Sequence, residues 1–238
     1  MLPPFAHTAL LLDLDGTLID LAPTPNSVVL PPGLTDTLRA LEAALDGALA
    51  IVTGRAIEVL DRILGHAFAA AGEHGGALRP SAATPIQRPN LPAAPGAWLN
   101  AAAALVAAHP GTLLERKARG FAVHFRQAPE AGPAIHAALT ALITEDPGFQ
   151  LLRGLMLWEI RPAGADKGTA VRALMAHPPF RGRLPLFIGD DVTDEDAISA
   201  CRTMGGAGLR VDAAFGTPAG VRAWLVRAAE LHDWTEPP

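Results

Sequence analysis

Two acidic side chains stand one residue apart near the start of the chain. Asp13 and Asp15 follow the apolar run at residues 10–12 and precede a glycine and a threonine. Such a run indicates a buried strand whose C-terminal end carries chemistry, and an extended chain points both carboxylates to the same side. Neighbouring carboxylates repel each other unless a cation or a shared proton lies between them. Because Asp-Gly also occurs in hairpin turns, this segment alone leaves a chemical and a structural interpretation open.

A second acidic segment follows the apolar residues 184–188. Asp194 to Asp196 fit the first turn of a helix, where the helix dipole favours negative charge, but capping does not explain Asp190 and Asp191 at the strand end. If a parallel sheet brings the two strand ends together, their carboxylates destabilise each other unless a metal ion binds. Oxygen ligands of this kind suit a hard cation that keeps several waters, so we expect Mg²⁺ as the cofactor.

Two further positions are typical of an anion site. Thr53 follows an apolar strand and precedes Gly54, Arg55 and a helical pattern. A hydroxyl and free backbone N–H groups at such a junction bind anions, although an ordinary threonine N-cap gives the same pattern. Lys167 falls in the first turn of a helix that Asp166 is expected to cap. A positive charge there opposes the helix dipole, so we expect an anion to offset it.

Strand and helix patterns alternate at both ends of the chain and must position these groups. Apolar residues recur at helical spacing after each of the first strands. Such alternation predicts the α/β class, with a doubly wound (Rossmann-like) parallel sheet whose ligand site lies at the C-terminal ends of the strands. The predicted strands are 10–12, Ala48–Val52, Phe68–Ala71, Leu184–Ile188 and Gly208–Val211, and Thr217–Leu231 is the closing helix.

The middle of the chain has a different character. Repeated prolines from residue 80 to 95 indicate a linker, and a helix, a hairpin, a helix and a second hairpin follow. We expect an inserted α+β domain at 79–162, with a core formed by 1–78 and 163–238. The predicted elements are a helix at 98–108, strands at 112–117 and 121–126, a helix at 131–144, and strands at 149–152 and 155–161 that turn at Arg153-Gly154.

Charged residues alternate along these middle strands. Alternation places the members of each pair on one side of their strand, and such pairs are most often solvated surface. The other interpretation is that they bind the hydroxyls and the phosphate of a sugar phosphate. The pairs are Glu115 with Lys117, His124 with Arg126, and Glu159 with Arg161.

Composition excludes several classes of protein. The 238 residues are 50% hydrophobic and carry a net charge of −5, and no basic stripe is present to hold nucleic acid. The single cysteine, Cys201, excludes an internal disulfide and fits a reducing compartment. No apolar run is long enough to cross a bilayer, and residues 1–8 have neither the charged segment nor the cleavage site typical of a signal peptide. We therefore expect a cytoplasmic monomer with neither nucleic acid nor membrane as a partner.

Taken together, these motifs resemble the haloacid dehalogenase superfamily of phosphatases. Within it, the sequence is similar to the trehalose-phosphatase family over essentially the whole chain. Leu14 and Phe125 depart from that family, which often has an aromatic residue and a tyrosine there; only the fine shape of the pocket is affected. The motifs are Asp13-Leu14-Asp15-Gly16-Thr17, Thr53-Gly54-Arg55, Gly72-x-His74-Gly75, Glu115-x-Lys117, His124-Phe125-Arg126, Glu159-Ile160-Arg161-Pro162, Lys167 and Gly189-Asp190-Asp191 through Asp196.

The resemblance implies a mechanism and a set of roles. Asp13 would become an aspartyl phosphate and Asp15 would act as general acid and base, while Thr53 and Lys167 bind phosphoryl oxygens. Mg²⁺ would be held by Asp13, the backbone carbonyl of Asp15, and Asp190, supported by Asp191 and Asp194. The middle segment would be a cap that closes over the site. The implied substrate-binding residues are Gly54, Arg55, His74, Glu115, Lys117, His124, Arg126 and Glu159.

The reaction implied in this way is Mg²⁺-dependent hydrolysis of trehalose 6-phosphate, a small-molecule sugar phosphate. One alternative is the same chemistry on another substrate, such as sucrose phosphate or mannosyl-3-phosphoglycerate, because the core fixes the reaction and only the cap reads the alcohol. A second is a catalytically silent module that binds sugar phosphates, although every expected catalytic position is filled. A haloacid dehalogenase proper needs no second acid and no metal, so Asp15 argues against it.

Overall fold

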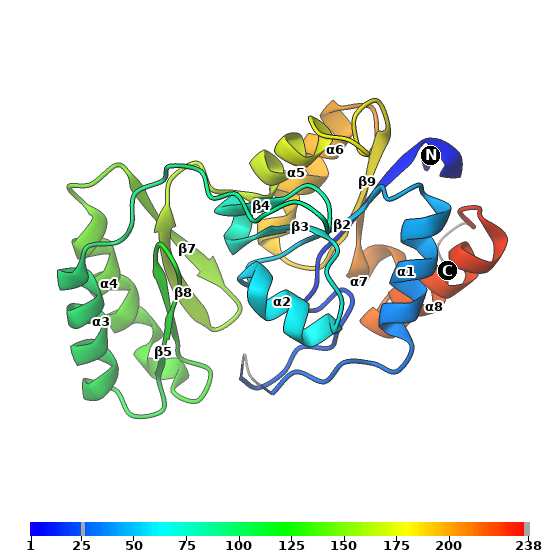
Figure 1. Ribbon diagram of the computed structural model, residues 1–238. Helices are drawn as coiled ribbons and strands as arrows, with labels where there is room; N and C mark the ends of the chain where they lie inside the picture. The colour runs from blue at the N-terminus through cyan, green and yellow to red at the C-terminus, as the bar shows by residue number, and fades with distance from the viewer. Residues whose placement is uncertain (25–26, 236–238) are drawn as a thin grey trace. The chain divides into compact units, whose positions relative to one another are not determined.

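A central sheet of six strands carries the two acidic strand ends. The computed structural model describes residues 1–24 and 27–235 (Figure 1). Within them the strand order is β10-β9-β1-β2-β3-β4. Strand β4 is antiparallel to β3, and the other neighbours are parallel. Both faces of β1, β2 and β3 are buried, as their unbroken apolar sequence predicts. The strands are β1 (Thr8–Leu12), β2 (Leu49–Val52), β3 (Ala69–Gly72), β4 (Ala77–Arg79), β9 (Leu184–Gly189) and β10 (Ala207–Arg210).

Helices cover both faces of this sheet. The helices α1 and α8 pack against each other on one face, while α5 and α6 pack together on the other (Figure 1). From β1 the sheet grows through β2 and β3 on one side and through β9 and β10 on the other. The strand order therefore reverses between β1 and β9, and a ligand site is expected at that point. The predicted doubly wound α/β fold is therefore confirmed. The helices are α1 (Leu34–Ala44), α2 (Ile57–Leu64), α5 (Lys167–Met175), α6 (Glu195–Thr203), α7 (Val211–Ala214) and α8 (Pro218–Leu231), with 3₁₀ turns η1 (Phe5–His7), η2 (Glu73–Gly75) and η4 (Val192–Asp194).

The residues 89–165 form a unit of their own. Contacts divide the chain into Met1–Arg88 with Asp166–Pro238, and Pro89–Ala165. The second unit is an antiparallel sheet, β5-β6-β8-β7, packed on α3 and α4 around a separate apolar core that includes Phe121, Ile135 and Ile160. Its elements are α3 (Gly96–Ala108), β5 (Leu113–Arg116), β6 (Phe121–His124), η3 (Pro129–Ala131), α4 (Gly132–Ile143), β7 (Phe149–Gly154) and β8 (Leu157–Pro162).

Two details differ from the sequence prediction. The second hairpin turns at Leu155-Met156, where Met156 has a φ of 61°, and not at Arg153-Gly154. The strand β4 directly precedes the proline-rich segment and was not predicted. Its last residue, Arg79, is buried and donates hydrogen bonds to Asp61 and to the carbonyl of Phe68, which ties this segment to the first unit.

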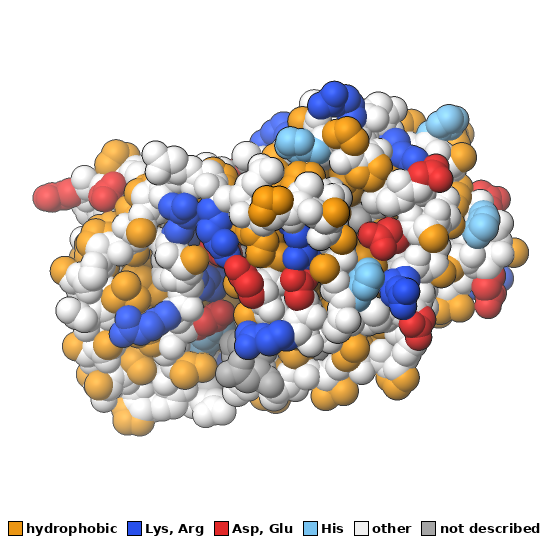
Figure 2. All heavy atoms as spheres, in the orientation of Figure 1, with side chains coloured by type: hydrophobic (Ala, Val, Ile, Leu, Met, Phe, Trp, Pro, Cys, Tyr) orange, Lys and Arg blue, Asp and Glu red, His pale blue; other side chains and the backbone are white. Residues whose placement is uncertain are grey.

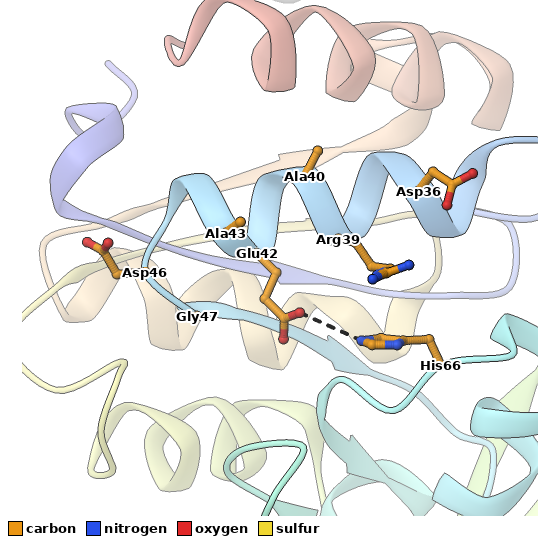
Figure 3. A pocket seen from close by; sticks show the side chains of 8 residues that line it. All are labelled: Asp36, Arg39, Ala40, Glu42, Ala43, Asp46, Gly47 and His66. Atoms are coloured by element: carbon orange, nitrogen blue, oxygen red, sulfur yellow. Dashed lines mark ion pairs between the residues drawn. The ribbon is translucent and has the colours of Figure 1, made fainter.

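The surface of the described residues carries charges of both signs (Figure 2) and a hollow beside α1. Charged side chains of both signs are scattered over the face drawn in Figure 2. A hollow beside α1 is lined by Asp36, Arg39 and the ion pair between Glu42 and His66, whose Oε2 and Nε2 atoms are 3.8 Å apart (Figure 3). Burial raises the pKa of Glu42, and the neighbouring His66 opposes this shift. Among residues 1–24 and 27–235 no helix is long and apolar enough to cross a membrane.

Candidate active site

The C-terminal ends of β1 and β9 bring the two acidic segments together. The backbone N–H of Asp13 donates to the carbonyl of Ile188, which extends the pairing of β1 with β9 as far as Asp13. Asp13, Asp190 and Asp194 each place a carboxylate oxygen within 4.8 Å of the others, and we call these three residues the carboxylate cluster. The predicted convergence of residues 13 and 190, far apart in sequence, is thus present in the structure.

A buried lysine bridges two members of the carboxylate cluster. The Nζ atom of Lys167 lies 2.6 Å from Oδ1 of Asp13 and 2.6 Å from Oδ1 of Asp194. Asp13 is 4% exposed, Lys167 is 3% exposed and Asp194 is fully buried. Lys167 is the first residue of α5, where Asp166 accepts a hydrogen bond from the N–H of Thr169 as the expected N-cap. The anion that offsets the lysine charge is therefore this pair of carboxylates.

The charge balance of these groups suits a divalent cation. Three carboxylates of the carboxylate cluster face one ammonium, so two negative charges are left uncompensated among these four groups. Burial raises the pKa of Asp13, an effect that Lys167 opposes and Asp194 strengthens. Burial also raises the pKa of Asp190 to about 6, and repulsion from Asp194 adds to it. Burial alone would lower the pKa of Lys167, but Asp13 and Asp194 outweigh it and raise that pKa.

The turn after β1 is shaped to receive Asp190. Gly16 has a φ of +82°, and a Cβ atom at this position would lie 2.1 Å from Oδ2 of Asp190. Only glycine fits such a conformation at such a close approach. The hydroxyl of Thr17 donates to Oδ1 of Asp190 over 3.3 Å and so orients this carboxylate. Sequence reasoning noted this hydroxyl without giving it a role; its position directly after the glycine was the available signal. Hard oxygen ligands in such a cradle fit Mg²⁺.

Asp191 lies outside the carboxylate cluster. Its side chain accepts a hydrogen bond from the N–H of Val192, and its own N–H donates to Oδ2 of Asp194. The two acids therefore form a capping box around η4. Of the acidic residues expected at the metal, the structure brings together Asp13, Asp190 and Asp194, and it gives Asp191 the helix-capping role.

The side chain of Asp15 forms an ion pair with Arg55. The Nε and Nη2 atoms of Arg55 each lie 2.7 Å from a different carboxylate oxygen of Asp15. Arg55 follows β2 in the predicted anion motif, and its backbone N–H donates to Oγ1 of Thr53 over 3.1 Å. Thr53 is buried, and its carbonyl accepts a hydrogen bond from the N–H of His74. Asp15, Thr53, Arg55 and His74 thus form a connected group beside the carboxylate cluster.

His74 occupies an unusual backbone conformation. Glu73 and His74 each have a φ of 54°, a left-handed region that residues other than glycine rarely adopt. The His74 ring lies so close to Gly54 that a Cβ on this glycine would be 2.4 Å from Nε2. Strain of this kind is found at functional sites, and this conformation places the ring against the loop that follows β2.

The charged residues of the second unit form two cross-strand pairs. Nζ of Lys117 lies 2.6 Å from Oε2 of Glu159, and Nε2 of His124 lies 2.8 Å from Oε2 of Glu115. Burial alone would raise the pKa of Glu115, but the hydrogen bond from His124 and the charge of Lys117 outweigh it and lower that pKa. The strand register aligns Glu115 and Glu159 across Ala122. Lys117 directly follows β5, and Arg126 lies beyond the end of β6 and is exposed.

Comparison with known proteins gives one family. The family model described as trehalose-phosphatase matches residues 11–218. A probable trehalose-phosphate phosphatase of Sinorhizobium fredii (strain NBRC 101917 / NGR234) is 41% identical over 208 residues, covering 85% of this chain and 77% of that protein. A trehalose-6-phosphate phosphatase of Escherichia coli (strain K12) is 35% identical over 235 residues, covering 97% of this chain and 86% of that protein.

Solved structures share the fold. The C-terminal domain of trehalose-6-phosphate phosphatase from C. albicans superposes with a TM-score of 0.78 at 20% identity, covering 94% of this chain and 92% of that chain. A haloacid dehalogenase-like hydrolase from Bacteroides thetaiotaomicron gives a TM-score of 0.60 at 15% identity, covering 92% and 98%. These similarities confirm the fold that the sequence motifs implied.

Proposed function

The chain belongs to the trehalose-phosphatase family, and on that premise we propose that it hydrolyses trehalose 6-phosphate to trehalose and phosphate. The observation that carries this proposal is the juxtaposition of the Asp13 carboxylate, the Lys167 ammonium and two further carboxylates at the ends of β1 and β9. Such a set supplies a nucleophile, a positive donor and the ligands of a divalent ion.

Asp13 is the proposed nucleophile. A carboxylate oxygen of Asp13 attacks phosphorus and the bond from phosphorus to the sugar oxygen breaks. Asp15 must enter this step as the carboxylic acid; it gives its proton to the sugar oxygen and is left as a carboxylate. Water then attacks the phosphorus of the aspartyl phosphate while Asp15 takes a proton from the water, and phosphate leaves. The contact between Asp13 and Lys167 supports this role, because the ammonium favours the ionised form of a carboxylate that burial destabilises.

The remaining core residues bind the phosphoryl group. Lys167 contacts the nucleophile and is therefore close to any phosphorus that Asp13 attacks, and Thr53 directly follows the neighbouring strand β2. Both supply donors where negative charge develops. Asp13 and Asp190 would hold Mg²⁺, supported by Asp194. When bound, the ion offsets the charge of the transferring phosphoryl group.

We assign the sugar contacts to the second unit. The ion pairs from Lys117 to Glu159 and from His124 to Glu115 align four polar side chains on one sheet. Carboxylates and an ammonium held in this way suit the hydroxyl groups of a disaccharide. This unit is the proposed cap, which would exclude bulk water during the reaction.

Phosphate release from a panel of substrates tests the proposal. We expect kcat/KM for trehalose 6-phosphate to exceed that for sucrose 6-phosphate and mannosyl-3-phosphoglycerate by at least about tenfold, the order that one well-placed contact gives. The matched control is Asp13→Asn, which keeps the shape of the side chain and should abolish turnover. A tenfold preference for either other substrate, with Asp13→Asn inactive, would retain the chemistry and overturn the substrate. Turnover by Asp13→Asn would overturn the mechanism.

A further inference from the structure

The pairing of Asp15 with Arg55 assigns a role to a residue for which sequence reasoning expected direct substrate binding. We propose that Arg55 is a positioning residue, which sets the orientation of the Asp15 carboxylate and acts on the reaction only through it. The inference rests on the proposed function, because it requires Asp15 to transfer a proton to the leaving oxygen. Its evidence is the geometry of the pair and the way the backbone of Arg55 is fixed.

The pair has the geometry that restricts a carboxylate most. Two different nitrogens of Arg55 bind two different oxygens of Asp15, each over 2.7 Å, and the side chains are 14% and 29% exposed. A bidentate guanidinium fixes the plane of the carboxylate as well as its distance. Asp15 has no oxygen within the carboxylate cluster, whose members are Asp13, Asp190 and Asp194. Arg55 is thus the charged partner that the structure gives Asp15.

The backbone on either side of this pair is held in place. Arg55 donates its N–H to Thr53 Oγ1, and its carbonyl accepts from the N–H of Glu73 over 2.9 Å. Gly72 packs against the same carbonyl, since a Cβ there would lie 2.8 Å from the oxygen. On the other side, Asp15 forms a β-bridge with Ile19. With both backbones fixed, the guanidinium determines where the carboxylate lies.

Lys167 and Arg55 therefore act on different parts of the reaction. Lys167 contacts Asp13 and Asp194, the groups assigned to the phosphoryl transfer and the metal. Arg55 contacts the group assigned to the leaving oxygen. Removal of Arg55 should therefore slow the departure of a sugar alkoxide, which needs a proton, far more than the departure of a group that leaves well as an anion.

A double-mutant cycle with two substrates tests this role. The proteins are the wild type, Arg55→Ala, Asp15→Asn and the double variant, each assayed with trehalose 6-phosphate and with p-nitrophenyl phosphate, whose leaving group needs no proton. We expect Arg55→Ala to lower kcat for trehalose 6-phosphate by about 10- to 100-fold with little change in KM, as a misplaced catalytic group does. The loss with p-nitrophenyl phosphate should be much smaller. In the Asp15→Asn background, Arg55→Ala should add no further loss.

Two further variants separate positioning from folding. Arg55→Lys keeps the charge but cannot form two parallel bonds, and it should lose kcat in the same direction to a smaller extent. The control Arg183→Ala removes an arginine that pairs with Asp46 just before β9. Because an exposed ion pair contributes little to stability, this variant should keep kcat within about twofold of the wild type. Equal thermal unfolding temperatures of the variants would show that the changes in kcat are not losses of fold.

Distinct outcomes overturn distinct statements. If Arg55→Ala raises KM for trehalose 6-phosphate and leaves kcat intact, Arg55 binds substrate and the positioning role is wrong. If Arg55→Ala lowers kcat for trehalose 6-phosphate by the same factor in the wild type and in Asp15→Asn, Arg55 acts independently of Asp15 and the positioning role is wrong. If Asp15→Asn alone retains kcat for trehalose 6-phosphate, the error lies in the acid assigned under the proposed function, and the role of Arg55 falls with it.

Discussion

Replacement of Lys167 by methionine should destabilise the protein in a pH-dependent way. The ammonium lies 2.6 Å from Asp13 and 2.6 Å from Asp194 in an almost fully buried site. Methionine fills a similar volume and leaves both carboxylates without this partner. Removal of one member of a buried ion pair costs about 3–5 kcal/mol. For a chain of this size we expect the unfolding temperature to fall by about 10 °C at neutral pH.

The sign of the pH dependence follows from the pKa values. Burial already raises the folded-state pKa of Asp13, and Lys167 opposes that rise, so its loss raises the pKa further. A carboxyl whose folded pKa exceeds its unfolded value contributes stability that is complete below the unfolded pKa and is lost as pH rises through the folded pKa. The deficit of Lys167→Met should therefore be larger at pH 8 than at pH 5.

Thermal unfolding followed by calorimetry in chelator checks this prediction. The wild type and Lys167→Met are compared at pH 5 and pH 8, with Lys117→Met as a control that removes a lysine from the less buried ion pair with Glu159. The control should show a smaller loss and a weaker dependence on pH. Equal stability of Lys167→Met and the wild type at pH 8, or a deficit that grows towards pH 5, would refute the reasoning.

Two further predictions concern the carboxylate cluster, and a third concerns the second unit. Gly16→Ala places a Cβ 2.1 Å from Asp190 Oδ2 at a φ of +82°; Mg²⁺ affinity measured by calorimetric titration should fall at least about tenfold, and unchanged affinity would exclude this cradle. Because burial raises the pKa of Asp190 to about 6, the gain in unfolding temperature from Mg²⁺ should be larger at pH 8 than at pH 5; an equal gain would contradict binding by Asp190. Glu159→Gln removes the charge that pairs with Lys117; KM for trehalose 6-phosphate should rise about tenfold while p-nitrophenyl phosphate is affected less, and an equal effect on both would argue against a sugar contact.

Sequence reasoning predicted the strands that carry the site because their signals are local. The apolar runs before Asp13 and before Asp190 each end in acids, and a parallel sheet necessarily brings the C-terminal ends of its strands to one edge. The signal of Lys167 is local as well. A lysine in the first turn of α5 opposes the helix dipole, and this predicted a nearby anion.

Other features depend on contacts that no local pattern encodes. The strand β4 is short and followed by prolines, and its place in the sheet depends on the buried contacts of Arg79 with Asp61 and the carbonyl of Phe68. The pairing of Arg55 with Asp15 joins segments that follow different strands. Likewise, the division of the acids between the carboxylate cluster and the cap of η4 depends on the direction of the Asp191 side chain. Side-chain direction at a strand end is set by tertiary neighbours.

The central claim is that Asp13 carries the phosphoryl group during turnover. Borohydride reduces an aspartyl phosphate to homoserine, so quenching the enzyme with borohydride during steady turnover of trehalose 6-phosphate and sequencing its peptides by mass spectrometry locates the modified residue. We predict homoserine at position 13, dependent on substrate and on Mg²⁺. Homoserine at another acidic residue, or rapid turnover with position 13 still aspartate, would contradict the account.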